Sequence, residues 1–545
     1  MRSRAGRRVA AAQRADPRSR YGLRAATDHP GVSAGRTKLR PSMVMRPRSR
    51  PPIEVSAPAA QVQARFDTSR HELSDATARR LRDACASVAT DPVALVEASR
   101  DWWPIGLRWA RAGMVPALPH AVVRPSSAAE VADVLRICND DLVPVTAAGG
   151  RSGVCGGAVP VRGGIALDVR ALSGIVSVDD ASCLVEVRAG TVGIDLEETL
   201  RGEHALTVGH WPQSIELSTV GGWIACRAAG QYSTRYGKIE DIVAGVEVVL
   251  AGGRVVRTGS LAGAGPRAAT GPDLTQLFVG SEGTLGVLTS ALLRVHPQPR
   301  IDRRDAWTFR TFDDGLNAVR RTLRRGATPA VVRLYDAEES RRNFNHDAGN
   351  LLVALDEGDD RIVDAAMTVL TEECEAGERL DRRFVDHWYE TRNDVSALAN
   401  VVNMGVVVDT IEVAAPWRTL LSVYEEATDR LRAIEGTIVA SAHQSHAYID
   451  GACLYFTFAG MGPDPTDDAW AEAYYRSAWD AVMRATRNHG GSISHHHGIG
   501  LVRGAYVAEA LGEGYAVLRS LKTALDPNGI LNPGKLGLGG AESGW

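Results

Sequence analysis

The sequence predicts an α+β protein with more than one domain. Its 545 residues are too many for one ordinary hydrophobic core, so two or three domains are expected. Between residues 116 and 298, short strand-like apolar runs alternate with three loops of small residues. Between residues 299 and 520, further strands are mixed with long helical patterns, which is typical of a second α+β domain.

The three loops are the most informative feature of the chain. They cover residues 146–157, 212–222 and 280–286, and each contains paired or closely spaced glycines. Successive main-chain amides in such loops form a concavity for anions, and glycine lets a ligand approach the backbone. One loop alone is explained equally well as a tight turn, and neither the Rossmann fingerprint nor a P-loop is present. Three loops together predict a flat, phosphate-bearing dinucleotide held across a sheet.

The chain begins with an Arg-rich segment. The first fifty residues hold thirteen Arg and one Lys against two Asp, with few apolar residues. Self-repulsion and low apolarity predict a disordered tail over residues 1–58. Two alternatives remain open: an organelle transit peptide, or sequence upstream of a true start at Met43 or Met45.

Residues 59–115 are predicted to form an N-terminal helical segment, because apolar positions recur at helical spacing. Those positions are Leu81, Ala84, Cys85, Val88 and Leu95.

The first domain is predicted to span residues 116–298. Ser126 and Ser127 predict the start of a helix, and Gly252-Gly253 predicts a hairpin turn. The strand-like runs are residues 120–125, 142–145, 164–168, 184–188, 242–250 and 254–257, followed by a pair at 286–289 and 293–296.

The second domain is predicted to span residues 299–520. Its strand-like runs are 330–334, 351–355 and 452–458, and its long helices are 359–375, 416–434 and 466–489. A turn-rich C-terminal segment, residues 521–545, is predicted to return to the first domain.

Composition excludes several classes of protein. A net charge of −3 argues against a nucleic-acid-binding protein. The seven cysteines are scattered without a CxxC pair, which indicates free thiols in a reducing compartment, and we expect a cytoplasmic location. No apolar run approaches the roughly 18–20 residues that cross a bilayer.

Three consecutive histidines, His495 to His497, form the second unusual motif. Consecutive residues cannot all point one way, so a polar wall of an active site that moves protons is the favoured interpretation. A metal site usually has spaced ligands, so no metal is predicted. A solvent loop that happens to be His-rich is the other alternative.

Tyr455 lies in a predicted strand and faces away from Leu454 and Phe456, because side chains alternate. A structural tyrosine is the default interpretation. A proton acceptor would require a lowered pKa.

These residues resemble a known family. Residues 209–230, 236–241, 270–273, 280–286 and 494–498 carry motifs similar to those of the alkyldihydroxyacetonephosphate synthases (alkylglycerone-phosphate synthases). These are FAD-binding flavoproteins of the vanillyl-alcohol-oxidase-like, or PCMH, type. The resemblance runs from about residue 115 to the C-terminal end. It implies a two-subdomain FAD-binding domain followed by an α+β cap, or substrate, domain with an antiparallel sheet.

The resemblance implies noncovalent FAD, since Arg151 stands where covalent relatives have a flavin-linked histidine. The implied cofactor-binding residues form three groups: Ala148, Gly149, Gly150, Arg151 and Ser152; Gln213, Ser214, Ser218, Thr219, Cys226, Arg227, Ala228 and Ala229; and Glu282, Gly283, Thr284, Leu285, Gly286, Val287 and Leu288.

The resemblance also implies a reaction. The family exchanges the acyl group of acyl-dihydroxyacetone phosphate for a fatty alcohol, through a covalent adduct at flavin N5, in ether-lipid synthesis. Tyr455 would remove the proton, His495, His496 and His497 would be the active-site histidines, and Arg333 would match an arginine needed for activity. The implied partners are these lipid substrates, with peripheral membrane contact, a homodimer and no nucleic acid.

One departure concerns the substrate phosphate. The family has an Arg-Asp pair shortly before the residue that corresponds to Glu412, but residues 396–400 contain no Arg. Arg392 is the nearest candidate. A related FAD-linked dehydrogenase of a D-2-hydroxy acid, of the D-lactate or glycolate type, is therefore the alternative. Such enzymes tend to carry Glu-His-Gly where this chain has residues 496–498, which counts against that alternative. A flavin-binding protein without catalysis is a third hypothesis.

Overall fold

The computed structural model describes residues 53–66, 73–394 and 397–539. Most of the predicted tail, residues 1–52, lies outside the described residues. The prediction of disorder up to residue 58 is wrong for its last part. Ile53 is buried against Leu107, Ala110 and Val402, and the amide of Ser56 donates to the carbonyl of Ala110. A few contacts of Ile53, Val55 and Ser56 hold this short stretch on the domain, and composition averaged over fifty residues does not detect them.

The first described sheet has the strand order β2-β4-β6-β5, and β4, β6 and β5 are parallel. Its strands are β2 Val88–Ala89, β4 Ala121–Val123, β5 Val145–Ala148 and β6 Ile165–Asp168. Helix α4 (Ala128–Asp140) connects β4 to β5 and begins as predicted, with the Ser127 hydroxyl accepting from the Glu130 amide at 3.2 Å. On the outer edge, Val145 pairs in parallel with Leu531, so the C-terminal segment extends this sheet.

The N-terminal segment differs from the predicted helical segment. Helix α1 (Asp75–Ala84) ends before Val88, which belongs to strand β2 and pairs with Val123. Helices α2 (Pro92–Glu97) and α3 (Pro104–Arg111) follow, and strand β1 (Gln63–Ala64) pairs with β3 (Met114–Val115). Helical spacing failed here because Ser87 and Pro92 divide the apolar series into separate short elements.

The second sheet is antiparallel, with the order β11-β10-β12-β8-β7. Its strands are β7 Ile175–Asp179, β8 Leu184–Arg188, β10 Val243–Val249, β11 Val255–Arg257 and β12 Val287–Arg294. The predicted hairpin at Gly253 is confirmed, with a φ of 77°. The predicted strand pair at 286–296 is wrong, because Val287 to Arg294 form one continuous strand that pairs on both sides.

Helices α5 (Gly193–Thr199) and α6 (Val220–Cys226) pack against this second sheet, and their core contains Leu196, Val220 and Ile224. Short helices α7 (Ser233–Tyr236) and α8 (Ile239–Ile242) follow. Strands β9 (Leu206–Thr207) and β13 (His296–Pro297) form a small antiparallel pair.

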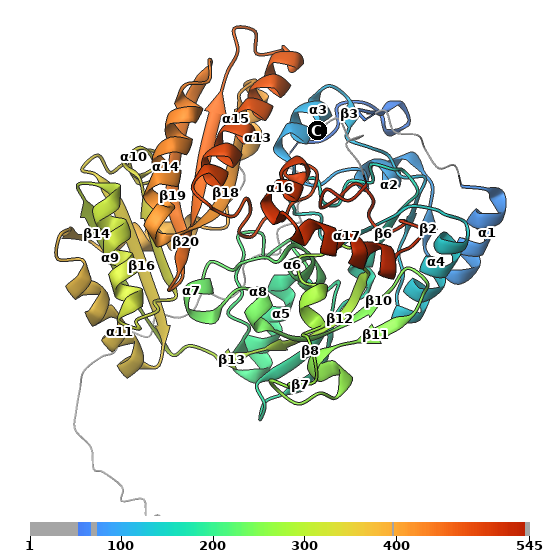
Figure 1. Cartoon of the computed structure of the whole chain (residues 1–545), viewed down its shortest axis with the longest axis horizontal. Helices are drawn as coiled ribbons and strands as arrows, with labels where there is room; N and C mark the ends of the chain where they lie inside the picture. Colours follow the sequence, from blue (N-terminus) through green and yellow to red (C-terminus); the bar gives the residue numbers. More distant parts are fainter. Residues whose placement is uncertain (1–52, 67–72, 395–396, 540–545) are drawn as a thin grey trace, which may run out of the picture. The chain divides into compact units, whose positions relative to one another are not determined.

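The third sheet is the antiparallel sheet of the second domain, with the order β17-β14-β16-β15-β19-β20-β18 (Figure 1). Its strands are β14 Ile301–Phe309, β15 Val331–Tyr335, β16 Asn350–Gly358, β17 Glu378–Leu380, β18 Val407–Pro416, β19 Thr437–Ala447 and β20 Gly451–Gly460. The sequence predicted β15, β16 and β20 but not β14, β18 or β19. Those three strands contain polar and charged residues on one face, which weakens the apolar signal.

Helices cover one face of the third sheet (Figure 1). They are α9 Phe312–Arg324, α11 Asp360–Glu373, α14 Trp417–Arg432 and α15 Asp468–Asn488. Leu454 and Phe456 of β20 point into this helical layer and are fully buried. The opposite face packs against α12 (Arg383–Thr391) and against Tyr232 of the first domain. In β20, the residues that alternate with Leu454 and Phe456 therefore face away from the helical layer, and so do their cross-strand partners in β18 and β19.

The remaining described helices are α10 Ala337–Phe344, α13 Ala397–Asn403, α16 Val507–Leu511 and α17 Gly514–Leu525. In the described ranges, no helix combines the length and the apolar character that a membrane crossing requires.

The first and second Gly-rich loops lie in contact. A Cβ atom on Gly150 would stand 1.9 Å from the carbonyl oxygen of Leu217, and one on Gly149 would stand 2.1 Å from the hydroxyl oxygen of Thr219. These distances are far below contact, so both glycines are needed for the close approach of the two loops.

We predict that Gly150→Ala destabilises the protein by about 1–3 kcal/mol, because the backbone of Leu217 must move to admit the methyl group. Thermal unfolding measures the effect. Gly202→Ala is the control, since a Cβ there meets no atom within 4 Å. Equal unfolding temperatures for Gly150→Ala and the parent would contradict the prediction.

Candidate active site

The carboxylate of Glu412 holds the backbone of the histidine loop. Its two oxygens accept the successive amides of His495, His496 (3.2 Å) and His497 (2.9 Å). The Ser494 hydroxyl and the Arg503 guanidinium add two further donors, each at 3.0 Å. Glu412 lies on β18 and is 0 % exposed. Five donors on one carboxylate fix the backbone of the three histidines.

A second buried carboxylate, Glu282, holds the residues just after the histidines. It accepts the amides of Ile499 at 2.5 Å and Gly500 at 2.9 Å. Glu282 belongs to the third Gly-rich loop of the first domain, whereas Glu412 belongs to the sheet of the second. The histidine loop is therefore fixed from both domains.

Burial by itself would raise the pKa of the Glu412 carboxyl, but Arg503, the nearby imidazoles and the His495 amide hold that pKa below its usual value. Glu412 is therefore ionised at neutral pH. Its ion pair with Arg503 is fully buried on both sides, which makes the loss of either partner costly.

The three imidazoles are neutral at physiological pH. Burial, assisted by Lys238, lowers the pKa of His495 to about 3, and burial lowers that of His497 to about 4. The pKa of His496 is also lowered, first by burial and then by His497. Neutral imidazoles each offer one donor and one acceptor, so they suit proton handling better than charge stabilisation.

Tyr455 faces the histidines, as its alternation with Leu454 predicted. Its ring lies 5.5 Å from the ring of His497 and 6.0 Å from that of His496, and its hydroxyl accepts from Thr410 at 3.0 Å. Burial raises the pKa of the Tyr455 hydroxyl above its usual value. The lowered pKa that a proton acceptor would require is not found in the free protein, so Tyr455 is a neutral phenol there.

Sequence reasoning missed His443, which belongs to the same row of side chains. Across four adjacent strands, Tyr335, His443, Tyr455 and Glu412 are direct cross-strand partners. The His443 ring stacks on Tyr455 at 5.0 Å, and its Nδ1 lies 2.7 Å from the carboxylate of Glu339. His443 lies two residues from Ser441 and from Ser445, so all three belong to one face of the strand. This alternation did not mark His443 as a functional residue, and only the pairing of β19 with β20 places it beside Tyr455.

His446 was also missed. Its Nδ1 lies 2.7 Å from the hydroxyl of Ser233 in the first domain, and its ring stacks on His495 at 5.0 Å. Lys238 of the first domain donates to the carbonyl of His495 at 2.6 Å.

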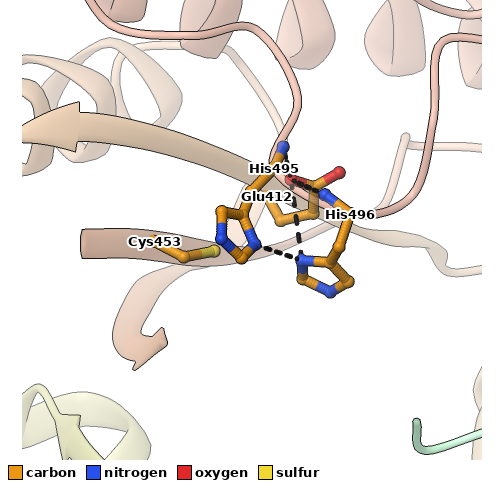
Figure 2. A group of neighbouring side chains, drawn as sticks. All are labelled: Glu412, Cys453, His495 and His496. Carbon is orange, nitrogen blue, oxygen red and sulfur yellow. Dashed lines mark hydrogen bonds and ion pairs between the residues drawn. The ribbon is translucent and has the colours of Figure 1, made fainter. Parts of the chain in front are cut away.

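Figure 2 shows four side chains that could be taken for a metal site: Glu412, Cys453, His495 and His496. The oxygens of Glu412 already accept five hydrogen bonds, including one from a cation. Burial raises the pKa of the Cys453 thiol, which disfavours the thiolate that binds metals. Glu412 therefore holds the backbone of the histidine loop rather than coordinating an ion.

Two arginines, Arg333 and Arg392, lie near the ring of Trp388, and Arg333 is also close to His443 and His446. Both guanidinium groups stand within 6 Å of the Trp388 ring, at 5.7 and 5.9 Å. Neither forms an ion pair with a carboxylate in the described part of the chain. The Nε atoms of both, and the indole nitrogens of Trp388 and Trp211, are buried donors without a partner there. Four unpaired donors and two positive charges suit an anionic group.

The three Gly-rich loops meet next to the histidine loop. The amide of Glu282 donates to Ala225 at 2.9 Å, and Asn532 of the C-terminal segment donates to Gly157 and to Glu282. A Cβ on Gly498 would stand 2.6 Å from Glu282, so the histidine loop lies directly on the third loop.

The predicted cofactor-binding residues are brought together, with some side chains turned away. Arg227 is exposed and pairs with Glu240 at 3.2 Å, and Gln213 is exposed. Leu285 and Leu288 are buried in the core of the second sheet and Val287 in that of the first, so only their backbone can reach a ligand. The remaining predicted residues lie at the loops: Ala148, Gly149, Gly150, Arg151, Ser152, Ser214, Ser218, Thr219, Cys226, Ala228, Ala229, Glu282, Gly283, Thr284 and Gly286.

Arg151 supplies a direct sign of a ligand with acceptor groups. It contacts Asp168 at 3.7 Å through Nη1, but its buried Nε and Nη2 atoms have no partner in the described residues. The ring nitrogens of fully buried His210 are likewise unpaired. These donors, beside loops of open backbone, fit a large nucleotide cofactor such as FAD.

Comparison with known proteins agrees with this fit. Residues 119–259 match the family model described as an FAD binding domain, and residues 299–536 match FAD linked oxidases, C-terminal domain. The chain is 31 % identical over 438 residues to the Escherichia coli K12 protein called uncharacterized FAD-linked oxidoreductase YgcU. That alignment covers 77 % of this chain and 89 % of the relative.

Two further relatives have named activities. Alkyldihydroxyacetonephosphate synthase of Dictyostelium discoideum is 28 % identical, with 78 % of this chain and 74 % of the relative covered. Glycolate oxidase subunit GlcD of Bacillus subtilis is 26 % identical, with 77 % and 89 % covered. A solved structure of alkyldihydroxyacetonephosphate synthase shares the fold, with a TM-score of 0.70 and 24 % identity, over 87 % of this chain and 88 % of that one.

The fold and the site define a two-domain flavoprotein enzyme with an FAD-binding domain and an antiparallel cap domain. The chain belongs to the family of FAD-linked oxidases, and its cofactor is FAD. The predicted fold class is confirmed.

We predict that Glu412→Gln lowers the free energy of unfolding by about 3 kcal/mol at pH 7, because Arg503 is left as an unpaired buried charge. The folded-state pKa of Glu412 is depressed, so its contribution is present above the unfolded pKa of about 4.3 and is lost as pH falls below that value. Thermal unfolding at pH 7 and pH 4 measures the difference. Glu509→Gln, at an exposed ion pair with Arg487, is the control. If Glu412→Gln lowered the free energy of unfolding by the same amount at pH 7 and pH 4, the depressed pKa assigned to Glu412 would be contradicted.

Proposed function

We propose that the chain is an alkyldihydroxyacetonephosphate synthase-like enzyme that exchanges the acyl group of acyl-dihydroxyacetone phosphate for a fatty alcohol. The single observation that carries the proposal is the row of Tyr455 and the three neutral histidines at the meeting point of the FAD-binding loops and the cap sheet. The similarity to named synthases adds support.

FAD, when bound, supplies an electrophilic N5 position that can hold a carbon fragment or accept a hydride. The protein groups handle the protons. Tyr455 would face the reactive carbon of a bound substrate and would receive its proton only while releasing its own, because its raised pKa disfavours a phenolate in the free protein. His495 and His496 are hydrogen-bonded to each other through their Nδ1 atoms at 2.9 Å, so one of their two lone pairs is already engaged, and the neutral imidazole of His497 offers another acceptor for that proton.

Arg333, Arg392 and Trp388 would bind the anionic end of the substrate. They combine two positive charges with unpaired N–H donors, an arrangement suited to a phosphate or a carboxylate. Arg392 would thus take over the task of the arginine that the family has closer to Glu412.

A specific observation favours a second function, the oxidation of a D-2-hydroxy acid of the D-lactate or glycolate type. The arginine of the phosphate-binding pair is missing from residues 396–400, and a carboxylate needs fewer donors than a phosphate. Similarity to a glycolate oxidase subunit supports the same alternative.

Anaerobic titration of the FAD-loaded protein separates the two functions. A synthase changes its flavin spectrum with acyl-dihydroxyacetone phosphate and releases fatty acid without an external electron acceptor. A dehydrogenase is bleached by a D-2-hydroxy acid and returns to yellow when an acceptor is added. No spectral change with acyl-dihydroxyacetone phosphate would reject the proposal.

We predict that Tyr455→Phe slows the reaction of the flavin with acyl-dihydroxyacetone phosphate by about a hundredfold, because the phenolic proton is lost from the transfer path. Stopped-flow absorbance measures the rate. Tyr474→Phe removes a comparable hydroxyl, which contacts Thr437 on the helical side of the sheet, and is expected to react normally. If both variants react at the parent rate, Tyr455 has no part in the chemistry.

We predict that Arg392→Ala raises the KM for acyl-dihydroxyacetone phosphate by about tenfold or more, with a smaller effect on kcat, because a charged hydrogen-bond donor to the anion is lost. Steady-state kinetics measures both constants. Arg382→Ala is the matched control on the same helix region, since Arg382 is an exposed partner of Asp386. An unchanged KM would remove Arg392 from the substrate site.

A further inference from the structure

His443 and Glu339 form a carboxylate–imidazole pair behind Tyr455 that the proposed mechanism does not yet use. Glu339 is the third residue of α10 and is 1 % exposed, and its Oε2 lies 2.7 Å from Nδ1 of His443. Its other oxygen accepts from Thr457 at 2.7 Å and from Arg342 at 3.2 Å. These donors hold the carboxylate in one orientation.

The contact determines the tautomer of His443. Burial would raise the pKa of the Glu339 carboxyl, but His443, Arg342 and Thr457 keep it below its usual value, so Glu339 is an ionised acceptor. Nδ1 of His443 must then carry the hydrogen, and Nε2 carries the lone pair. Nε2 has no hydrogen-bond partner in the described residues.

The ring is also held in place against Tyr455. His443 lies between Tyr335 and Tyr455, with both ring centroids at 5.0 Å, and the three residues are cross-strand partners. None of the three loop histidines has a comparable carboxylate contact, because the closest, His496 and His497, lie 3.9 Å from Glu412. His443 is thus the imidazole next to Tyr455 whose positive form a carboxylate stabilises directly.

We infer that His443, oriented and charge-balanced by Glu339, is the group on which the substrate proton comes to rest. This inference rests on the proposed function. A C–H bond next to the substrate carbonyl breaks, its electron pair stays on carbon, and the proton ends on Nε2 of His443 with Tyr455 between them. In the exchange the C–O bond to the acyl group breaks and the fatty acid leaves as a carboxylate, while the alcohol oxygen bonds to the same carbon and releases its proton. A proton returns to that carbon as the ether forms, so no oxidant or reductant is consumed.

Several charged or titratable groups surround His443 and bear on its pH dependence. They are Glu339 and Arg342 of α10, Arg333 and Tyr335 of β15, His446 of β19, and Tyr455 of β20, with Asp336 beside Glu339. The pKa of His443 lies below its usual value, because burial, assisted by Arg333 and Arg342, outweighs the raising effect of Glu339. Removing the negative charge of Glu339 therefore lowers the pKa further.

The test compares Glu339→Gln and His443→Gln with the parent, all loaded with FAD. The glutamine at position 339 can still accept from Nδ1, so the variant removes charge while keeping the contact. Exchange of the imidazole C2 hydrogen with deuterium, followed by mass spectrometry, gives the pKa of His443. Stopped-flow rates of the flavin change with acyl-dihydroxyacetone phosphate are measured from pH 5 to pH 9. They give the acid limb of the reaction, which is the fall of the rate at low pH.

We expect Glu339→Gln to lower the pKa of His443 and to move the acid limb to lower pH by the same amount, about one pH unit or more. The rate of Glu339→Gln at high pH, where the rate no longer changes with pH, is expected to fall, because a weaker base accepts the proton less readily. His443→Gln is expected to lose the limb and about a hundredfold in rate. Glu426→Gln is the matched control, since Glu426 contacts His489 at 2.8 Å on the helical side of the cap, and it should behave as the parent.

Two results would overturn the inference while the proposed function stands: a lowered His443 pKa with an unmoved acid limb, or a parent-like rate for His443→Gln. A parent protein whose flavin does not respond to acyl-dihydroxyacetone phosphate would overturn the proposed function, and the inference with it. The two failures are therefore distinguishable.

Discussion

The conformation of the histidine loop depends on two buried carboxylates from different domains. Glu412 accepts the amides of three successive histidines, and Glu282 accepts the next two available amides, at Ile499 and Gly500. The histidine loop belongs to no helix or strand, so its amides have no partners in regular secondary structure. The two carboxylates accept the hydrogen bonds that backbone carbonyls of a helix or sheet would otherwise accept. Because one carboxylate comes from the FAD-binding loops and the other from the cap sheet, the active site forms only where the domains meet.

The same constraint explains the protonation of the site. The carboxylate of Glu412 is paired with Arg503, and its raising effect on the pKa of His495 and His497 is smaller than the lowering effect of burial. Burial then dominates, and the three histidines remain neutral. Glu339 is different, because one of its oxygens contacts only His443. Two buried carboxylates in one site thus have separate tasks, one structural and one acting on an imidazole.

Much of the fold follows from local signals. The Ser127 cap, the Gly253 hairpin and the alternation at Tyr455 are short-range patterns, and each was predicted correctly. Predictions failed where the outcome depended on a distant partner. Val88 belongs to a strand because it pairs with Val123 at the edge of the first sheet. Strands β18 and β19 each carry polar residues on one face, so their sequences were not recognised as strands before their pairing was known. The contacts of the Glu339 and Glu412 carboxylates could not be predicted for the same reason, because their partners lie far away in the chain.

The sequence by itself predicted a dinucleotide held by three Gly-rich loops, because glycine spacing is a chemical feature of the chain, and its resemblance to FAD-binding flavoproteins implied the cofactor. The tertiary structure decided which groups act on one another. It showed that Gly149 and Gly150 let two loops meet, that Arg227 turns to the surface, and that His443 stands next to Tyr455. Contacts between residues far apart in the chain depend on which strands pair and on how the domains pack, and no local pattern specifies either.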